Sequence, residues 1–199
     1  MSTRVIKVGN KLLGGNNPIL IQTMADIKTS KVDEVVKEAQ ECEKIGADLI
    51  RFSVLDDDDI EGLKIIKRNL NIPIVADIHF DYLLAIKAIN AGVDKIRINP
   101  GNIGNIERVK AVTEACKAKN IPIRIGVNSG SLEKDILERD GKPTAKGLVE
   151  SALRHVKILE ELNFYDIVIS IKSSDVPMMI EAYRLMSTKC NYCLLYTSD

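Results

Sequence analysis

The sequence carries no net charge, because its 28 lysines and arginines are balanced by 28 aspartates and glutamates among 199 residues. A neutral chain creates no general field that draws it to nucleic acid or to an anionic membrane, so we expect neither as a partner. Any affinity for an anion must therefore come from a local arrangement of basic side chains.

Long apolar segments are also missing. The apolar stretches are no longer than a strand, and the strand-like residues 4–8 follow Met1 almost directly, without a signal peptide, a transit peptide or a transmembrane helix. We therefore expect a cytoplasmic protein. The length suits one sizeable hydrophobic core, and nothing in the composition marks a second domain.

Cysteines are few, and the four present give little indication of a metal site. Cys42 and Cys116 each share a helical stripe with apolar residues, which is typical of small core residues. Cys190 and Cys193 form Cys-Asn-Tyr-Cys, a spacing that can bind zinc or an iron–sulfur cluster or act in redox exchange. A lone C-x-x-C without a second pair of cysteines or histidines is weak, so we expect no metal site in this chain.

The sequence does contain a regular alternation of strand and helix patterns. After a hairpin at residues 4–13, strands are expected at 18–24, 48–54, 73–77, 94–98, 122–127 and 166–171, and helices at 30–45, 57–70, 81–90, 105–119, 144–162 and 175–187. Ser30 and Asp33 are expected to cap the first helix. Gly46 and Gly92 are placed where a helix can end in the left-handed conformation.

The strand patterns are continuous apolar runs such as Ile-Val-Ile-Ser-Ile, which indicate a parallel sheet buried on both faces. No G-x-G-x-x-G follows the first strand, so a TIM-type barrel is favoured over a doubly wound sheet. A closed barrel has eight strands, and this pattern supplies six. We therefore predict an α/β fold, an incomplete TIM-type (β/α) barrel with an amino-terminal β-hairpin.

Polar residues recur at the carboxyl ends of these strands, where a TIM barrel binds its ligands above an interior of branched apolar side chains. They are Arg51, Asp77, His79, Arg97, Asn99, Arg124, Asn128 and Lys172. Arginine presents a fork of donors that matches phosphate oxygens, so the recurrence indicates an anionic substrate. The alternative for each arginine is an ordinary surface ion pair with Asp48, Asp94 or Glu150.

Two loops follow strands on the same side. Residues 99–104 contain glycines that let backbone amides approach an oxyanion, although glycines also simply form turns. Residues 128–142 form a connection much longer than usual, which suggests a mobile lid.

Four motifs are long and unusual enough to carry a family resemblance. They are Ala-Asp-Ile-His-Phe-Asp-Tyr (76–82), Lys-Ile-Arg-Ile-Asn-Pro-Gly-Asn-Ile-Gly (95–104), Ile-Arg-Ile-Gly-Val-Asn-Ser-Gly-Ser-Leu-Glu-Lys-Asp (123–135) and Glu-Ser-Ala-Leu-Arg-His (150–155). From about Thr3 to Lys189 the chain resembles the barrel domain of 4-hydroxy-3-methylbut-2-enyl diphosphate synthase, an iron–sulfur oxidoreductase of the non-mevalonate isoprenoid (terpenoid) pathway. The resemblance implies reductive ring opening and dehydroxylation of 2-C-methyl-D-erythritol 2,4-cyclodiphosphate.

The same resemblance implies roles for the strand-end residues. Arg51, Arg97, Arg124 and Lys172 would neutralise the diphosphate; Asn99, Asn128 and His79 would hydrogen-bond its phosphates or hydroxyls; Asp77 would orient a neighbouring base. The ligands of a [4Fe-4S] cluster would lie in a carboxyl-terminal domain, absent from this chain, that covers the partner's barrel mouth in a head-to-tail homodimer. Reduced ferredoxin or flavodoxin would supply the electrons.

Two other interpretations stay open, namely a pterin-binding TIM-barrel synthase and a non-catalytic diphosphate-binding fragment. After Lys189 the sequence departs from the family pattern. We therefore expect residues 1–189 to form a partial barrel domain and residues 190–199 to be an aberrant tail.

Overall fold

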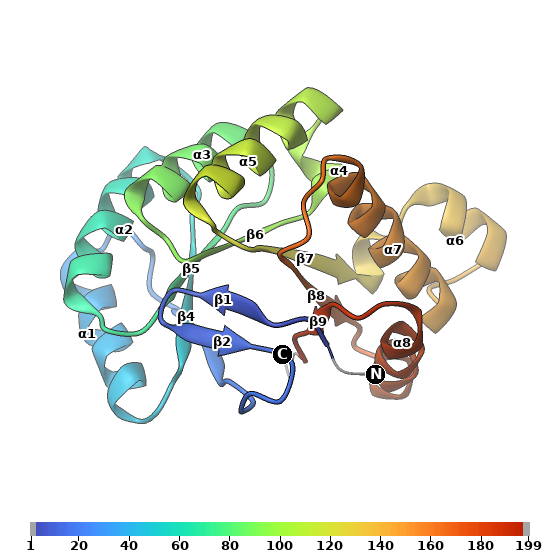
Figure 1. Cartoon of the computed structure of the whole chain (residues 1–199), viewed down its shortest axis with the longest axis horizontal. Helices are drawn as coiled ribbons and strands as arrows, with labels where there is room; N and C mark the ends of the chain where they lie inside the picture. Colours follow the sequence, from blue (N-terminus) through green and yellow to red (C-terminus); the bar gives the residue numbers. More distant parts are fainter. Residues whose placement is uncertain (1–2, 197–199) are drawn as a thin grey trace.

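The computed structural model describes residues 3–196, which form a curled parallel sheet with helices along its outer side (Figure 1). The sheet strands, in hydrogen-bonded order, are β3 (Gln22–Met24), β4 (Leu49–Ser53), β5 (Ile74–Asp77), β6 (Lys95–Ile98), β7 (Ile123–Asn128), β8 (Ile167–Lys172) and β9 (Cys193–Leu194). Every strand pairs with the next one along the chain, which confirms a TIM-type barrel that is open on one side. An antiparallel hairpin of β1 (Ile6–Val8) and β2 (Lys11–Leu13) precedes the sheet.

Helices connect the successive strands and cover the outer face of the sheet (Figure 1). They are α1 (Val32–Lys44), α2 (Asp57–Asn69), α3 (Tyr82–Ala91), α4 (Pro100–Ile103), α5 (Ile106–Lys119), α6 (Lys134–Asp140), α7 (Ala145–Glu161) and α8 (Val176–Lys189). Side chains just before several helices accept the first free amides, as when Asp81 accepts from Leu83 and Thr144 from Gly147. Gly92 ends α3 with φ 92°, as the sequence predicted.

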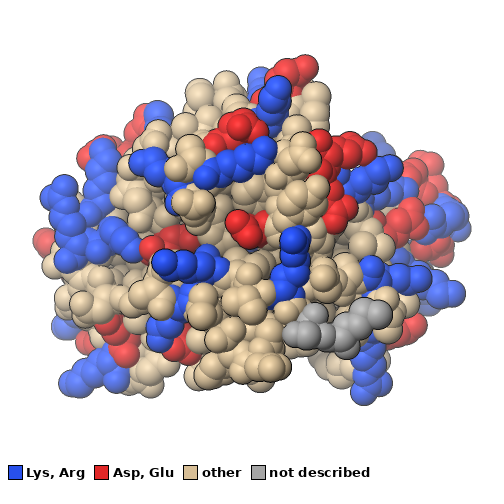
Figure 2. Space-filling view, in the orientation of Figure 1, with Lys and Arg blue, Asp and Glu red and all other residues tan. Residues whose placement is uncertain are grey.

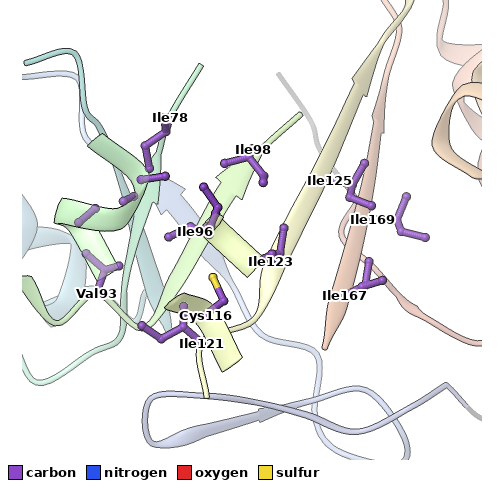
Figure 3. Packing of buried hydrophobic residues seen from close by; sticks show 14 of the residues in the cluster. Ile78, Val93, Ile96, Ile98, Cys116, Ile121, Ile123, Ile125, Ile167 and Ile169 are labelled. Carbon is purple, nitrogen blue, oxygen red and sulfur yellow. The ribbon is translucent and has the colours of Figure 1, made fainter. Parts of the chain in front are cut away.

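The main core lies between these helices and the outer face of the sheet. Alternate residues of three adjacent strands supply a layer of isoleucines, all fully buried, which Figure 3 shows side by side: Ile96, Ile98, Ile123, Ile125, Ile167 and Ile169. Because side chains alternate along a strand, the residues between these isoleucines point to the inside of the curled sheet.

The hairpin closes the amino end of the interior. Ile6 and Val8 pack against Val75 and Val168, which are the second residues of β5 and β8. Burying this apolar cluster fills the bottom of the barrel, so the carboxyl ends of the strands form its mouth.

The sheet has one strand more than the six predicted. β9 pairs in parallel with β8, with Cys193 opposite Val168 and Leu194 opposite Ile169. This strand lies within the segment 190–199 that the sequence sets apart as a tail, of which residues 197–199 lie outside the described part of the chain.

The predicted cap of the first helix is wrong. Lys31 occupies the N-cap position of α1 without a side-chain cap, and the Ser30 amide donates instead to Asp59 Oδ1 at 2.9 Å. Asp59 is fully buried and also accepts from the Leu55 amide, so a residue of α2 ties together two loops that precede helices. This tertiary contact replaces the local capping box.

The long connection after β7 contains regular structure. A short 3₁₀ turn spans Ser129–Ser131 and α6 follows, within the connection that the sequence analysis expected to be a mobile lid. Within residues 3–196, no helix has the length and apolar character needed to cross a membrane.

Candidate anion-binding site

The inner face of the sheet carries basic side chains above the branched apolar ones that the sequence analysis expected there. On β6, Lys95 and Arg97 alternate with the outward isoleucines, and on β7 Arg124 does the same. The apolar pattern did not reveal these basic residues, because the isoleucines of the same strands bury the outer face while the basic side chains between them are buried on the inner face.

Asp77 joins two of the predicted arginines. Its Oδ1 lies 3.0 Å from Arg97 Nη1, and its Oδ2 lies 3.6 Å from Arg51 Nε. The Asp77 side chain is only 5% exposed, and β5 lies between the strands that carry the two arginines. Arg51 also contacts Met24 Sδ through Nε at 3.2 Å and Nη2 at 2.8 Å. The carboxylate therefore holds two guanidinium groups side by side in the interior.

Arg124 is the third guanidinium of this group. It is paired in register with Arg97 and lies near the start of β7, deeper in the barrel than the carboxyl-end position that the sequence predicted. Its side chain is buried, and neither Nε nor Nη1 has a hydrogen-bond partner within the described structure. Burial, followed by the neighbouring Arg51 and Arg97, lowers the pKa of Arg124 to about 10. A buried, unpaired guanidinium is costly, and a bound anion would supply the missing acceptors.

Two contributors to the interior were missed by the sequence analysis. Gly126 is the inward residue after Arg124, and a Cβ there would lie 2.8 Å from Arg97 Nε, so the glycine makes room for that guanidinium. Lys95 is 1% exposed, and its Nζ donates to Gln22 Oε1 at 2.8 Å. The period-two alternation of residues 95–99 and 124–128 could have identified both.

Nearer the mouth, two asparagines cap short turns. Asn99 Oδ1 accepts from the Gly101 amide at 3.1 Å, and Asn128 Oδ1 accepts from the Gly130 amide at 2.9 Å. Because the backbone occupies the side-chain oxygens, each asparagine can offer its NH₂ group to a ligand. Lys172 is paired in register with Asn128 at the end of β8.

His79 is placed apart from the buried group. It lies in the exposed turn after β5, and its ring centroid is 6.1 Å from that of the exposed Phe80. The structure therefore brings Arg51, Asp77, Arg97 and Arg124 into one cluster. It places His79, Asn99, Asn128 and Lys172 closer to the strand ends.

The surface ion pairs considered as an alternative do not form. Asp48 pairs with Lys11 and Asp94 pairs with Lys67. Glu150 pairs with two other arginines, Arg139 and Arg154. Figure 2 shows basic and acidic side chains interspersed on the displayed face. The excess of positive charge thus lies inside the sheet, where three arginines and Lys95 face a single described carboxylate, Asp77.

The cysteines of the described chain are in structural positions. Cys193 Sγ donates to the carbonyl oxygens of Arg4, at 3.0 Å, and Leu13, at 3.5 Å, beneath the hairpin. Burial raises the pKa of both the Cys190 and Cys193 thiols, which disfavours the thiolate that a metal requires. Residues 3–196 contain no group of three or more histidine, cysteine or acidic side chains able to hold a metal ion.

Fold and site together define a TIM-barrel-type α/β protein with a basic interior suited to an anion. Residues 3–196 match the family model described as the GcpE TIM-barrel domain, and the chain belongs to this family. It is 59% identical over 192 residues to the 4-hydroxy-3-methylbut-2-en-1-yl diphosphate synthase (flavodoxin) of Clostridium perfringens, covering 96% of this chain and 55% of the relative. The protein of the same name from Caldanaerobacter subterraneus is 57% identical over 192 residues, with 96% and 54% covered. The chain spans about half the length of the curated relatives it matches.

Solved structures of lower identity share the fold. 3-Dehydroquinate dehydratase from Geobacillus kaustophilus superposes with a TM-score of 0.72 at 17% identity, covering 99% of this chain and 79% of that one. Dihydropteroate synthase from Yersinia pestis gives a TM-score of 0.67 at 14% identity, with 96% and 74% covered. At these identities the likeness concerns the fold alone.

Proposed function

We propose that this chain is the diphosphate-binding barrel of a 4-hydroxy-3-methylbut-2-en-1-yl diphosphate synthase. The parent reaction is the reductive ring opening and dehydroxylation of 2-C-methyl-D-erythritol 2,4-cyclodiphosphate in the cytoplasm. The buried arginine cluster carries the proposal, because the guanidinium of Arg124 has donors without acceptors at the bottom of a mouth built by several strands. A diphosphate supplies anionic oxygens that can accept two hydrogen bonds from one guanidinium.

The residues of this chain would bind and orient the substrate. Arg51, Arg97 and Arg124 would neutralise the deeper phosphoryl group, with Asp77 keeping two of them in position. Lys172 and the NH₂ groups of Asn99 and Asn128 would contact oxygens nearer the mouth, as would His79. Fixed charges in a water-poor interior stabilise an anion more than they would in water.

Electron transfer requires a cofactor, since side chains do not supply single electrons. In the parent enzyme a [4Fe-4S] cluster would provide the two electrons. The described residues do not fit that cluster, so its ligands would lie in a further domain, carried by a head-to-tail partner. Flavodoxin, which is in the names of the relatives, or ferredoxin would reduce it. Taken alone, the chain would bind the substrate without converting it.

A pterin-binding synthase is the weaker candidate. The likeness to dihydropteroate synthase extends to the fold, whereas the identity to the diphosphate synthases extends to the sequence along 96% of the chain.

The test is a titration of the chain with the cyclodiphosphate by calorimetry. Removing one arginine from a desolvated clamp leaves phosphate charge unpaired, which costs about 2–5 kcal/mol. We therefore expect Arg124→Ala to lose roughly thirtyfold to several-thousandfold in affinity. Arg124→Lys should recover part of this loss, because an ammonium keeps the charge but not the fork.

Lys110→Ala is the matched control, since Lys110 is an exposed cation on α5 and a solvated charge contributes little. Circular dichroism would verify that each variant keeps the fold. Equal affinity in Arg124→Ala and Lys110→Ala would contradict the proposed site.

A further inference from the structure

Lys95 is a buried cation to which the proposed function assigns no role. Its Nζ is enclosed in the barrel interior and donates to the neutral amide oxygen of Gln22. No carboxylate of residues 3–196 forms an ion pair with it. Burying an ammonium without an opposite charge is costly, so the neutral amine is favoured at this position.

The groups around Lys95 add to this cost. Arg51 on β4 and Arg124 on β7 are the cations that act on it most strongly. Val75 on β5 is paired in register with Lys95, Gln22 on β3 accepts its hydrogen bond, and the thiol of Cys193 on β9 acts in the opposite direction by raising its pKa. Burial, followed by Arg124 and Arg51, lowers the pKa of Lys95 from 10.5 to about 7. Near neutral pH, Lys95 therefore exists both as the amine and as the ammonium when no anion is bound.

An anion on Arg51 and Arg124 would reverse this balance. It would place negative charge beside the two cations that repel the ammonium, and an opposite charge favours the charged form of a neighbouring group. Because binding and protonation are linked, an anion that favours the ammonium must bind more tightly to the protonated protein.

We propose that Lys95 takes up a proton from solvent when an anion occupies the barrel interior, so that the site gains its fourth cation as it fills. The step converts an amine and a proton into an ammonium, with no bond made to the ligand and no electron transferred. The proposal rests on the proposed function only in so far as the interior binds an anion. It assigns Lys95 a role in affinity, and it predicts that affinity falls as the pH rises above about 7.

The test uses inorganic pyrophosphate and compares the unmodified chain with Lys95→Arg and Lys95→Met at about pH 6 and about pH 9. Pyrophosphate changes its own protonation between these pH values, but this change is the same for the three proteins. Differences in affinity between them therefore report on residue 95. Lys95→Arg keeps its charge at both values, and Lys95→Met has none. At about pH 6 we expect the unmodified chain to bind pyrophosphate as tightly as Lys95→Arg does. At about pH 9 we expect its affinity to fall at least about tenfold below that of Lys95→Arg, toward the affinity of Lys95→Met.

A second measurement does not depend on variants. Sulfate keeps its charge between about pH 6 and about pH 9, so its heat of binding at about pH 8 in two buffers of different ionisation enthalpy counts protons taken up by the protein. We expect a fractional uptake approaching one. No uptake, or the same pH dependence in all three proteins, would overturn the role of Lys95 while leaving the anion site in place. Absence of anion binding at every pH would overturn both.

Discussion

At the scale of single residues, Asp77 and Lys95 set the charge balance of the barrel interior. Asp77 neutralises one positive charge among four and aligns Arg51 with Arg97. Lys95 lies on the same face without an ion-paired carboxylate among residues 3–196, so its ammonium is repelled by the neighbouring arginines. Such unfavourable charge is expected where a protein is arranged for a ligand rather than for its own stability.

Replacing this lysine should stabilise the protein when no anion is bound. The pKa of Lys95 is depressed in the folded chain, so the unfolded chain binds more protons between about pH 7 and 10.5. The cost of burial is therefore full below about pH 7 and disappears as the pH rises toward 10.5. We expect Lys95→Met to raise the free energy of unfolding by about 1–4 kcal/mol near pH 7 and by less at higher pH.

Urea unfolding across this pH range would measure the effect, with Lys110→Met as an exposed control. A gain that stays constant with pH would show that Lys95 does not change its protonation in the folded chain.

At the scale of elements, α8 connects the last two strands of the sheet. The Tyr183 hydroxyl accepts from the Ile171 amide of β8 at 2.9 Å and donates to the Leu195 carbonyl just after β9. The residue is buried, so its hydroxyl adds to the backbone pairing that holds β9, a strand of only two residues, against β8.

Tyr183→Phe should therefore loosen β9. The substitution leaves a buried amide without an acceptor, which costs about 1–3 kcal/mol. We expect that loss in the free energy of unfolding, together with faster hydrogen exchange at Ile171 and Leu195. Tyr165→Phe, at a half-exposed tyrosine, is the control. If both variants unfold at the same urea concentration, the hydroxyl bridge does not hold the strand.

At the scale of the whole molecule, the described sheet is open between its edge strands β3 and β9. Ile19 and Ile21, just before β3, are 91% and 64% exposed. An unpaired strand edge beside exposed apolar side chains promotes association with other chains.

We predict that the chain associates with itself as its concentration rises, which sedimentation velocity would detect. The paired substitution Ile19→Lys and Ile21→Lys should shift the distribution toward monomer, because charge on an edge opposes pairing. Ile45→Lys is the control, since Ile45 is 85% exposed at the end of α1. A strictly monomeric unmodified chain with a sharp thermal transition would contradict the prediction.

The sequence alone determined the order of the six predicted strands and the helices that follow them, and the identity of most basic groups. Strand and helix periods and glycines such as Gly92 act over a few residues, so they can be recognised without the fold. The resemblance of residues 76–82 and 95–104 to one family likewise required only the order of amino acids.

Tertiary structure decided which groups meet. The position of Asp77 between two arginines, the unpaired Arg124 and the burial of Lys95 depend on the register of neighbouring strands that are distant in sequence. The same holds for Asp59, which displaced the predicted cap at Ser30, and for Cys193, which completes a seventh strand. Charge and hydrogen bonding act through space, so a linear pattern identifies the participants while the register of the sheet fixes their partners.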